Sequence, residues 1–183
     1  MLETFFIPIS VSSQVEERAK EIRKERDKVY KNIFVEEDTD MRWVGEVGEI
    51  CFNSWLLHEK VPNFMWYLDN PIGNPDFVIS GISVGVKTVK RKVPPQLNYT
   101  AQVTPKHVYS EPSDYFFFTS YEYLKKRMWL LGGIEKKEFI KLAKYYKIGD
   151  AIHKDYIVRH EIYNIEINKL IQPELWLKQV WRT

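Results

Sequence analysis

Apolar residues recur at helical spacing through the first third of the chain. Residues 12–33 predict a charged helix with a partial apolar stripe, and the Glu, Lys and Arg residues between the stripe positions can pair one turn apart. A second, more apolar helix is predicted from a cap at Thr39 or Asp40 to about His58, where Pro62 closes the element. The chain therefore begins with two helices of different character.

The pattern then changes from helical to extended. A hairpin is predicted around Ser80-Gly81, and apolar runs predict further strands; the expected strand ranges are 76–79, 82–89, 99–104, 114–120 and 127–134. Residues 135–146 predict a helix with Gly149 as a stop signal, residues 156–158 a short strand, and residues 162–170 stay open between strand and helix. The tail that carries Trp176 and Trp181 fits docking on the domain or on a partner subunit.

This order of elements predicts an α/β fold with a central mixed β-sheet flanked by helices. A length of 183 residues favours a single domain. Within it we distinguish an N-terminal charged helix and link (1–40), a core region (41–134), and a C-terminal helix with peripheral elements (135–183).

Composition narrows the class of protein. Hydrophobic residues make up 44 % of the chain, which suits a folded domain, and the longest apolar run, residues 128–134, is much too short for a membrane helix. The N-terminus has no basic n-region and no cleavage site, and the single cysteine, Cys51, excludes an internal disulfide. We expect a cytoplasmic protein without a membrane segment, in which Cys51 is a buried structural thiol.

Charge is unevenly distributed, although the formal net charge is only +2. No acidic residue lies between Asp76 and Glu111, whereas five basic residues do: Lys87, Lys90, Arg91, Lys92 and Lys106. Such a stretch is typical of a phosphate-facing surface or of an ordinary solvated rim, and charge alone leaves both interpretations open.

The second predicted helix carries a pair of glycines and a pair of acids. Gly45 and Gly48 in a helix interior suggest close approach to another backbone, for which the sheet is the expected neighbour. Glu46 and Glu49 are three residues apart and so lie on one face of the helix. At least one of these carboxylates is expected near the sheet edge.

The predicted hairpin adds an acid and a lysine. Asp76 starts the first strand, and Lys87 lies inside the apolar second strand, where it needs a carboxylate or phosphate partner. The hairpin brings Asp76 and Lys87 together, and the helix can add Glu49 or Glu46. Carboxylates and a lysine around one point suit hydrolysis of a phosphodiester with Mg²⁺ or Mn²⁺.

These residues resemble the PD-(D/E)XK nuclease superfamily, across roughly residues 41–134. The resemblance rests on the helix at 44–50, the Pro75-Asp76 step and the strand at 86–90, and it continues through 99–103 and 114–118. It is most similar to the small phage, archaeal-virus and resolvase-type members, in which a helix glutamate precedes an Asp…(Glu)-x-Lys hairpin. It implies a restriction-endonuclease-like core in a viral or mobile-element protein, with host cytoplasm as its location if viral.

The resemblance also implies roles. Glu49 is the helix acid, Asp76 the central metal ligand, Lys87 the catalytic lysine, the Val86 carbonyl a further metal ligand and Gln102 a supporting residue. Phosphate contacts are expected from Lys90, Arg91, Lys92 and Lys106. The implied partner is DNA, with branched and single-stranded forms among the candidates, and an enzyme that cuts both strands is compatible with a homodimer.

One position departs from the family pattern. The family places Asp or Glu two residues before the lysine, and this chain has Gly85 there. Glu46 and Glu49 are the expected substitutes, since both can reach the pocket from the helix. The sequence therefore predicts a metal-dependent DNA endo- or exonuclease. The alternatives are a nuclease-fold protein that binds nucleic acid or a protein partner without cleavage, and a purely structural protein.

Overall fold

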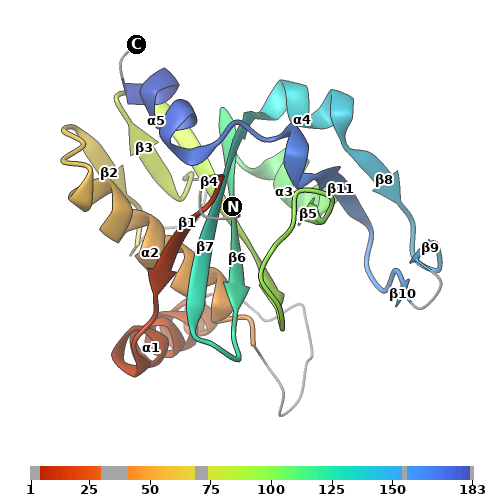
Figure 1. Cartoon of the computed structure of the whole chain (residues 1–183), viewed down its shortest axis with the longest axis horizontal. Coiled ribbons are helices and arrows are strands. Elements are labelled where there is room, and N and C mark those ends of the chain that lie inside the picture. Colours follow the sequence, from red (N-terminus) through yellow and green to blue (C-terminus); the bar gives the residue numbers. More distant parts are fainter. Residues whose placement is uncertain (1–4, 30–40, 69–73, 154–155, 182–183) are drawn as a thin grey trace.

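A six-stranded mixed sheet forms the centre of the computed structural model, which describes residues 5–29, 41–68, 74–153 and 156–181 (Figure 1). Across the sheet the strands follow the order β1 (Ile7–Ser10), β7 (Arg127–Glu135), β6 (Tyr115–Glu122), β4 (Ile82–Arg91), β3 (Phe77–Ile79) and β2 (Phe64–Trp66). Strands β4 and β6 are parallel, and all other neighbours in this sheet are antiparallel.

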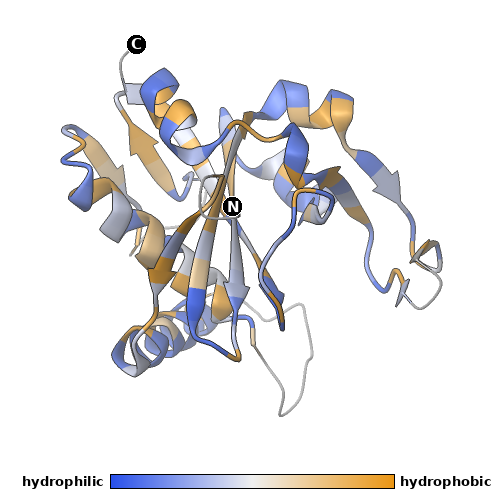
Figure 2. Cartoon of the chain, in the orientation of Figure 1, coloured by the Kyte–Doolittle hydropathy of each residue, from blue (hydrophilic) through white to orange (hydrophobic). Residues whose placement is uncertain are grey.

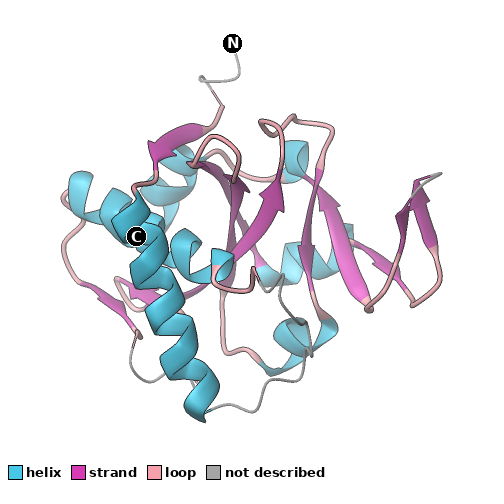
Figure 3. Cartoon of the chain, turned by 90° about the horizontal axis from the view of Figure 1, so that it is seen from below, coloured by secondary structure: helices cyan, strands magenta, loops and turns pink. Residues whose placement is uncertain are grey.

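Smaller elements surround this sheet. A second sheet has the order β5 (Thr100–Val103), β11 (Ile162–Glu166) and β8 (Lys144–Tyr146), and a hairpin joins β9 (Ala151–His153) to β10 (Tyr156–Ile157). The α-helices are α1 (Ser13–Val29), α2 (Val44–His58), α3 (Pro105–Ser110), α4 (Lys136–Leu142) and α5 (Pro173–Trp181), with a 3-10 turn at Ile167–Lys169. Helices lie on both sides of the central strands (Figure 3), which confirms the predicted mixed α/β class.

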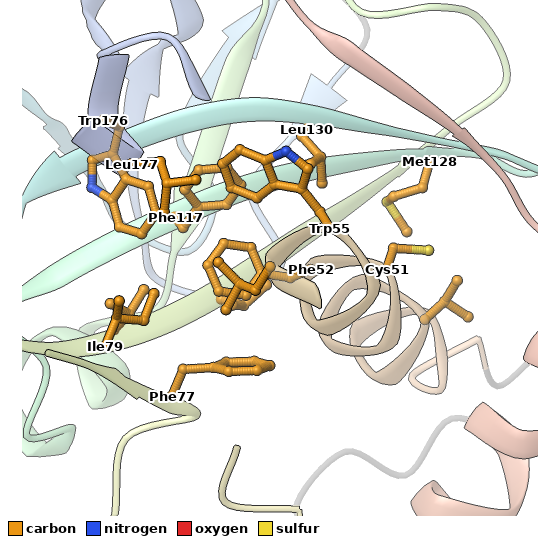
Figure 4. Close-up of a cluster of buried hydrophobic side chains, with 14 of the residues drawn as sticks. Cys51, Phe52, Trp55, Phe77, Ile79, Phe117, Met128, Leu130, Trp176 and Leu177 are labelled. Atoms are coloured by element: carbon orange, nitrogen blue, oxygen red, sulfur yellow. The ribbon is translucent and has the colours of Figure 1, made fainter. Parts of the chain in front are cut away.

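Side-chain alternation along β6 divides the core into two clusters. Phe117 faces the cluster that α2 and α5 cover, and its ring centroid lies 4.7 Å from that of Phe52 and 4.7 Å from that of Trp176 (Figure 4). Its neighbours Phe116 and Phe118 point the other way, into the cluster under α4 and the second sheet. Successive strand residues point to opposite faces, so one apolar run contributes to both cores.

Close packing of α2 on the sheet depends on Gly48. A Cβ at this position would lie 1.9 Å from the Oγ1 atom of Thr88 in β4, which confirms the sheet as the close neighbour, although the nearest atoms belong to side chains and not to the expected backbone. Gly45 has open space instead. Cys51, one turn after Val47, is buried, and this burial raises the pKa of its thiol to about 12.

The predicted hairpin between β3 and β4 is confirmed. Ser80 and Gly81 both have positive φ, of 49° and 83°, the backbone of a tight turn whose twist matches the flanking strands. Ile79 and Ile82 are paired directly across it. The register fixed by this turn places the residues before β3 beside the middle of β4.

Several elements differ from the sequence-based expectation. The helix predicted over 135–146 ends at Leu142, because the next residues pair with β11 as strand β8. The segment 162–170 is strand β11 followed by the 3-10 turn. The proposed caps Thr39 and Asp40 and residues 30–33 of the first predicted helix lie outside the described residues. Strands β1 and β2 and helices α3 and α5 were not expected.

The C-terminal helix α5 docks on the same chain. Trp176 is fully buried, and a Cβ at Gly133 of β7 would lie 2.4 Å from its Nε1 atom. The sequence left open whether this tail docks on its own domain or on a partner subunit, and Trp176 packs on its own domain. Helix α1 carries mainly hydrophilic residues (Figure 2), and none of the described helices is long and apolar enough to cross a membrane.

Candidate functional site

Asp76 and Lys87 meet at the hairpin, as the sequence predicts. Asp76 directly precedes β3, and its Oδ2 atom lies 3.5 Å from Nζ of Lys87 in β4. The backbone N–H of Val86 donates to the same oxygen at 2.7 Å. The carboxylate of Asp76 is therefore fixed by a main-chain hydrogen bond and by the lysine.

A third charged residue, Glu111, completes this cluster. It follows the short helix α3, and its Oε2 atom lies 2.5 Å from Nζ of Lys87. The hydroxyl of Ser113 donates to Oε1 at 2.6 Å. Asp76, Lys87 and Glu111 thus form one partly buried cluster in which a single lysine contacts two carboxylates.

Glu111 fills the space that a side chain at Gly85 would occupy. A Cβ built on Gly85 would lie 1.8 Å from Oε1 of Glu111 and 3.0 Å from the Oγ atom of Ser113. The space beside Gly85 is thus occupied by a carboxylate from another segment of the chain. Sequence reasoning missed Glu111, and the available signal was that it is the first acid after the acid-free stretch.

The cluster opens into a pocket of about 230 Å³, which we call the carboxylate pocket. The residues around it that carry polar groups include Asn74, Asp76, Lys87, Lys106, His107 and Glu111. Thr104 Oγ1 lies 2.9 Å from His107 Nδ1, which ties this histidine to the segment before α3. Charged groups from the hairpin and from α3 therefore face one cavity.

Burial and charge shift the proton affinities of the three groups in different directions. Burial raises the pKa of Asp76 to about 7 against the opposing effect of Lys87, and the negative charges of Glu49 and Glu111 raise it further. Glu111 is also desolvated, but Lys87 and the Ser113 hydroxyl hold its pKa below the usual range. Desolvation opposes the charge of Lys87, yet Asp76 and Glu111 raise its pKa. Near neutral pH the lysine and Glu111 are charged, and Asp76 is the group that titrates.

The helix acids Glu46 and Glu49 are held in a separate network. Arg26 of α1 donates to Glu49 through two hydrogen bonds of 2.7 and 2.9 Å and to Glu46 at 2.9 Å. Arg23 also donates to Glu46, and the indole N–H of Trp66 donates to Glu49 at 2.9 Å. The structure therefore places both glutamates against arginines, and Glu49 influences Asp76 through its charge.

Gln102 lies away from the Asp76–Lys87–Glu111 cluster. It belongs to β5 in the second sheet and lines a different cavity. Arg91 is half-buried, donates to the carbonyl of Thr100 and lies 5.0 Å from the ring centroid of Tyr99, so its guanidinium joins β4 to β5. Lys90, Lys92 and Lys106 are exposed. The basic stretch thus contains one buried lysine, one bridging arginine and three exposed lysines.

The donor set of the carboxylate pocket fits a hard divalent cation. Among the described residues, no three His, Cys, Asp or Glu side chains are grouped as a metal site. Mg²⁺, however, is commonly held by only one or two carboxylates, with waters and substrate phosphate as its other ligands. Asp76 and Glu111 supply two carboxylates on one cavity, which meets that requirement.

Comparison with known proteins gives no relative. No protein-family model, no curated protein and no solved structure matches this chain.

Proposed function

We propose that this chain is a metal-dependent DNA nuclease with a restriction-endonuclease-like core, as its resemblance to the PD-(D/E)XK superfamily implies. The single observation that carries the proposal is the carboxylate of Glu111, which lies in the space of a Gly85 side chain, beside Asp76 and Lys87. This arrangement supports a site of two acids and a lysine of the kind that the family pattern implies, with one acid from a different segment.

Each residue of the cluster has a role in this proposal. Asp76 and Glu111 would hold the cation, which lowers the pKa of a bound water and polarises the phosphate. Lys87, in contact with both carboxylates, positions the attacking water and offsets charge that develops on the phosphate oxygens. Lys106 on the edge of the pocket suits a neighbouring backbone phosphate. Glu49 acts through the charge that it contributes near Asp76.

A second candidate function is nucleic-acid binding without cleavage. The observation that favours it is the 2.5 Å ion pair between Lys87 and Glu111, because a lysine held this closely satisfies the carboxylate without a metal. In that case the basic stretch binds DNA, and the cluster serves only stability. The two candidates differ in their response to a chelator.

The decisive experiment is a cleavage assay on supercoiled plasmid, linear duplex, single-stranded and branched DNA with Mg²⁺, Mn²⁺ or EDTA. The wild type is expected to cut in a metal-dependent manner, and Asp76→Asn, Lys87→Ala and Glu111→Gln are each expected to lower the rate by about a hundred-fold or more. Glu138→Gln, an exposed acid paired with Lys141, is the matched control and should leave the rate unchanged. DNA binding indifferent to EDTA, without cutting, would support the second candidate.

Moving the acid from position 111 to position 85 tests directly whether the carboxylate of Glu111 takes the place of a side chain at Gly85. Gly85→Asp alone should lower activity, because the new side chain displaces the carboxylate of Glu111. Gly85→Asp combined with Glu111→Ala should be about ten-fold more active than Glu111→Ala alone, since residues in contact couple strongly. A folded double variant no more active than Glu111→Ala would show that the two positions are not equivalent.

A further inference from the structure

A second cavity, of about 620 Å³, lies between the end of β4 and the smaller sheet. We call it the carboxamide pocket, because Gln102 of β5 and Asn164 of β11 line it. These two residues are direct neighbours in the antiparallel register, so their side chains stand side by side. Neither residue contributes to the carboxylate pocket.

The smaller sheet has one apolar face and one polar face. Ala101, Val103 and Ile165 are buried in the core cluster on the side of Phe116. Alternation turns Gln102 and Asn164 to the opposite face, toward the cavity. The sheet is therefore anchored by its apolar face and presents two adjacent carboxamides on the other.

These carboxamides have unused hydrogen-bonding capacity. Asn164 is only 5 % exposed, yet its Oδ1 atom has no hydrogen-bond partner within the described residues. The Gln102 side chain is half-buried and likewise makes no hydrogen bond within the described part of the chain. Buried polar side chains are normally paired, because an unpaired one loses its hydration without compensation. An unpaired carboxamide beside a cavity points to a ligand with a complementary edge.

The charge around this cavity suits a nucleic acid. Among the residues that the structure describes, its lining includes Lys90 and Arg91 and no acidic side chain. The bond from Arg91 to the Thr100 carbonyl keeps the positive charge fixed at the wall between β4 and β5. Tyr156, 46 % exposed, offers an aromatic ring on the same cavity. Cationic groups with an aromatic ring are the common elements of single-strand binding sites.

Residues that line the two pockets are neighbours at two places. Thr88 of the carboxamide pocket follows Lys87 of the carboxylate pocket, and Thr104 of the first contacts His107 of the second at 2.9 Å. A strand whose phosphate lies at Lys87 can therefore place a nearby nucleotide against Gln102 and Asn164.

We propose that the carboxamide pocket binds an unpaired nucleobase of a single-stranded DNA segment next to the cleavage site. A carboxamide presents a donor and an acceptor side by side, which matches base edges such as N6–H and N7 of adenine. Inside a duplex the base would have to leave the stack, so single strands and branch points are the favoured substrates. This inference rests on the proposed nuclease function and narrows its substrate to DNA with unpaired bases.

The test measures the affinity of single-stranded 12-mers by fluorescence anisotropy in EDTA. The probes are oligo-dA, oligo-dT, oligo-dC and an abasic 12-mer of equal charge. The wild type should bind at least one base-bearing probe roughly ten-fold more tightly than the abasic probe, and Gln102→Met should remove most of that difference. Tyr156→Ala should weaken every base-bearing probe and spare the abasic one. Gln96→Met, an exposed glutamine outside the pocket, is the control.

Asn164→Leu is a second variant, but it changes a buried residue and can fail to fold. In that case the conclusion rests on Gln102→Met, which changes a half-buried residue. Equal wild-type affinity for base-bearing and abasic probes, or an unchanged base preference in Gln102→Met, would overturn the base pocket while leaving metal-dependent cleavage intact. Loss of base preference in Gln102→Met without any wild-type cleavage would keep the base pocket and reject the nuclease. Absence of binding to every probe would overturn the base pocket, whatever the cleavage assay shows.

Discussion

Two clusters of buried charge in this protein differ in their balance. Between α1 and α2, two arginines face two glutamates, and the side chains of Glu46 and Glu49 are only 3 % and 8 % exposed. At the β3–β4 hairpin, one lysine faces two carboxylates, and the cluster opens into a cavity. The balanced cluster pairs each glutamate with an arginine and joins two helices, although Glu46 Oε2 has no hydrogen-bond partner within the described residues. The other cluster places two carboxylates around one lysine at an open site, and under the proposed function a cation would bind there.

The largest expected effect is a difference in stability between variants that remove a cation from each of the two clusters. Among the described residues, Arg26→Met leaves the buried side chains of Glu46 and Glu49 with only Arg23 and Trp66 as side-chain partners, and it should lower the free energy of unfolding by about 3–5 kcal/mol. Lys87→Met should lower it by only about 1–3 kcal/mol, because the pocket admits water and Asp76 can take up a proton near neutral pH. Urea unfolding of both variants measures the difference.

Equal losses in the two variants would contradict the distinction between a closed and an open cluster. Arg18→Met serves as the control, because Arg18 forms an exposed pair with Glu21 within α1. Its effect should stay below about 0.5 kcal/mol.

A smaller effect is expected from pH. The pKa of Asp76, raised to about 7, keeps this carboxyl protonated in acid, and a metal needs the ionised form. Mn²⁺ affinity measured by calorimetry should therefore fall about ten-fold for each pH unit below 7. The folding stability of the metal-free protein should show the opposite trend and fall as the pH rises. A carboxyl whose pKa is raised on folding stabilises the folded state in acid, and this contribution disappears as the pH rises through about 7.

Asp76→Asn isolates this contribution. When both proteins are metal-free, the wild type should lose more thermal stability than Asp76→Asn as the pH rises from 5.5 to 7.5. These two pH values lie about 1.5 below and 0.5 above the pKa of Asp76. Identical pH profiles for the two proteins would show that Asp76 does not titrate in this range.

The smallest effects are expected in the basic stretch, where exposed lysines can be compared with an arginine that bridges two strands. Lys90→Ala, Lys92→Ala and Lys106→Ala should each weaken DNA binding a few-fold and lower the salt slope by about 1, without loss of stability. Arg91→Ala should instead destabilise the protein, because its guanidinium joins β4 to β5. Salt titrations of binding, together with thermal unfolding, distinguish these two groups. A lysine variant with an unchanged salt slope would remove that residue from the DNA surface.

The local sequence was sufficient to predict structure wherever the contacts join residues that are close in the chain. The Ser80-Gly81 turn fixes the hairpin register, so the approach of Asp76 to Lys87 was predictable from spacing alone. The helix periodicity of α2 was predictable for the same reason, whereas the contact of Gly48 with Thr88 joins segments that are distant in the sequence. The helix predicted over 135–146 was too long, because pairing of its last residues with β11 overrides their helical preference.

The sequence by itself determined the α/β class, the hairpin and the need of Lys87 for a carboxylate partner. Only the tertiary structure decided which cations pair with Glu46, Glu49 and Glu111. Docking of α1 against α2 engages Glu46 and Glu49 with arginines, and the path of the chain between β4 and β6 brings Glu111 to the space beside Gly85. Such pairings join residues twenty or more positions apart, and side-chain periodicity carries no information about contacts between distant segments.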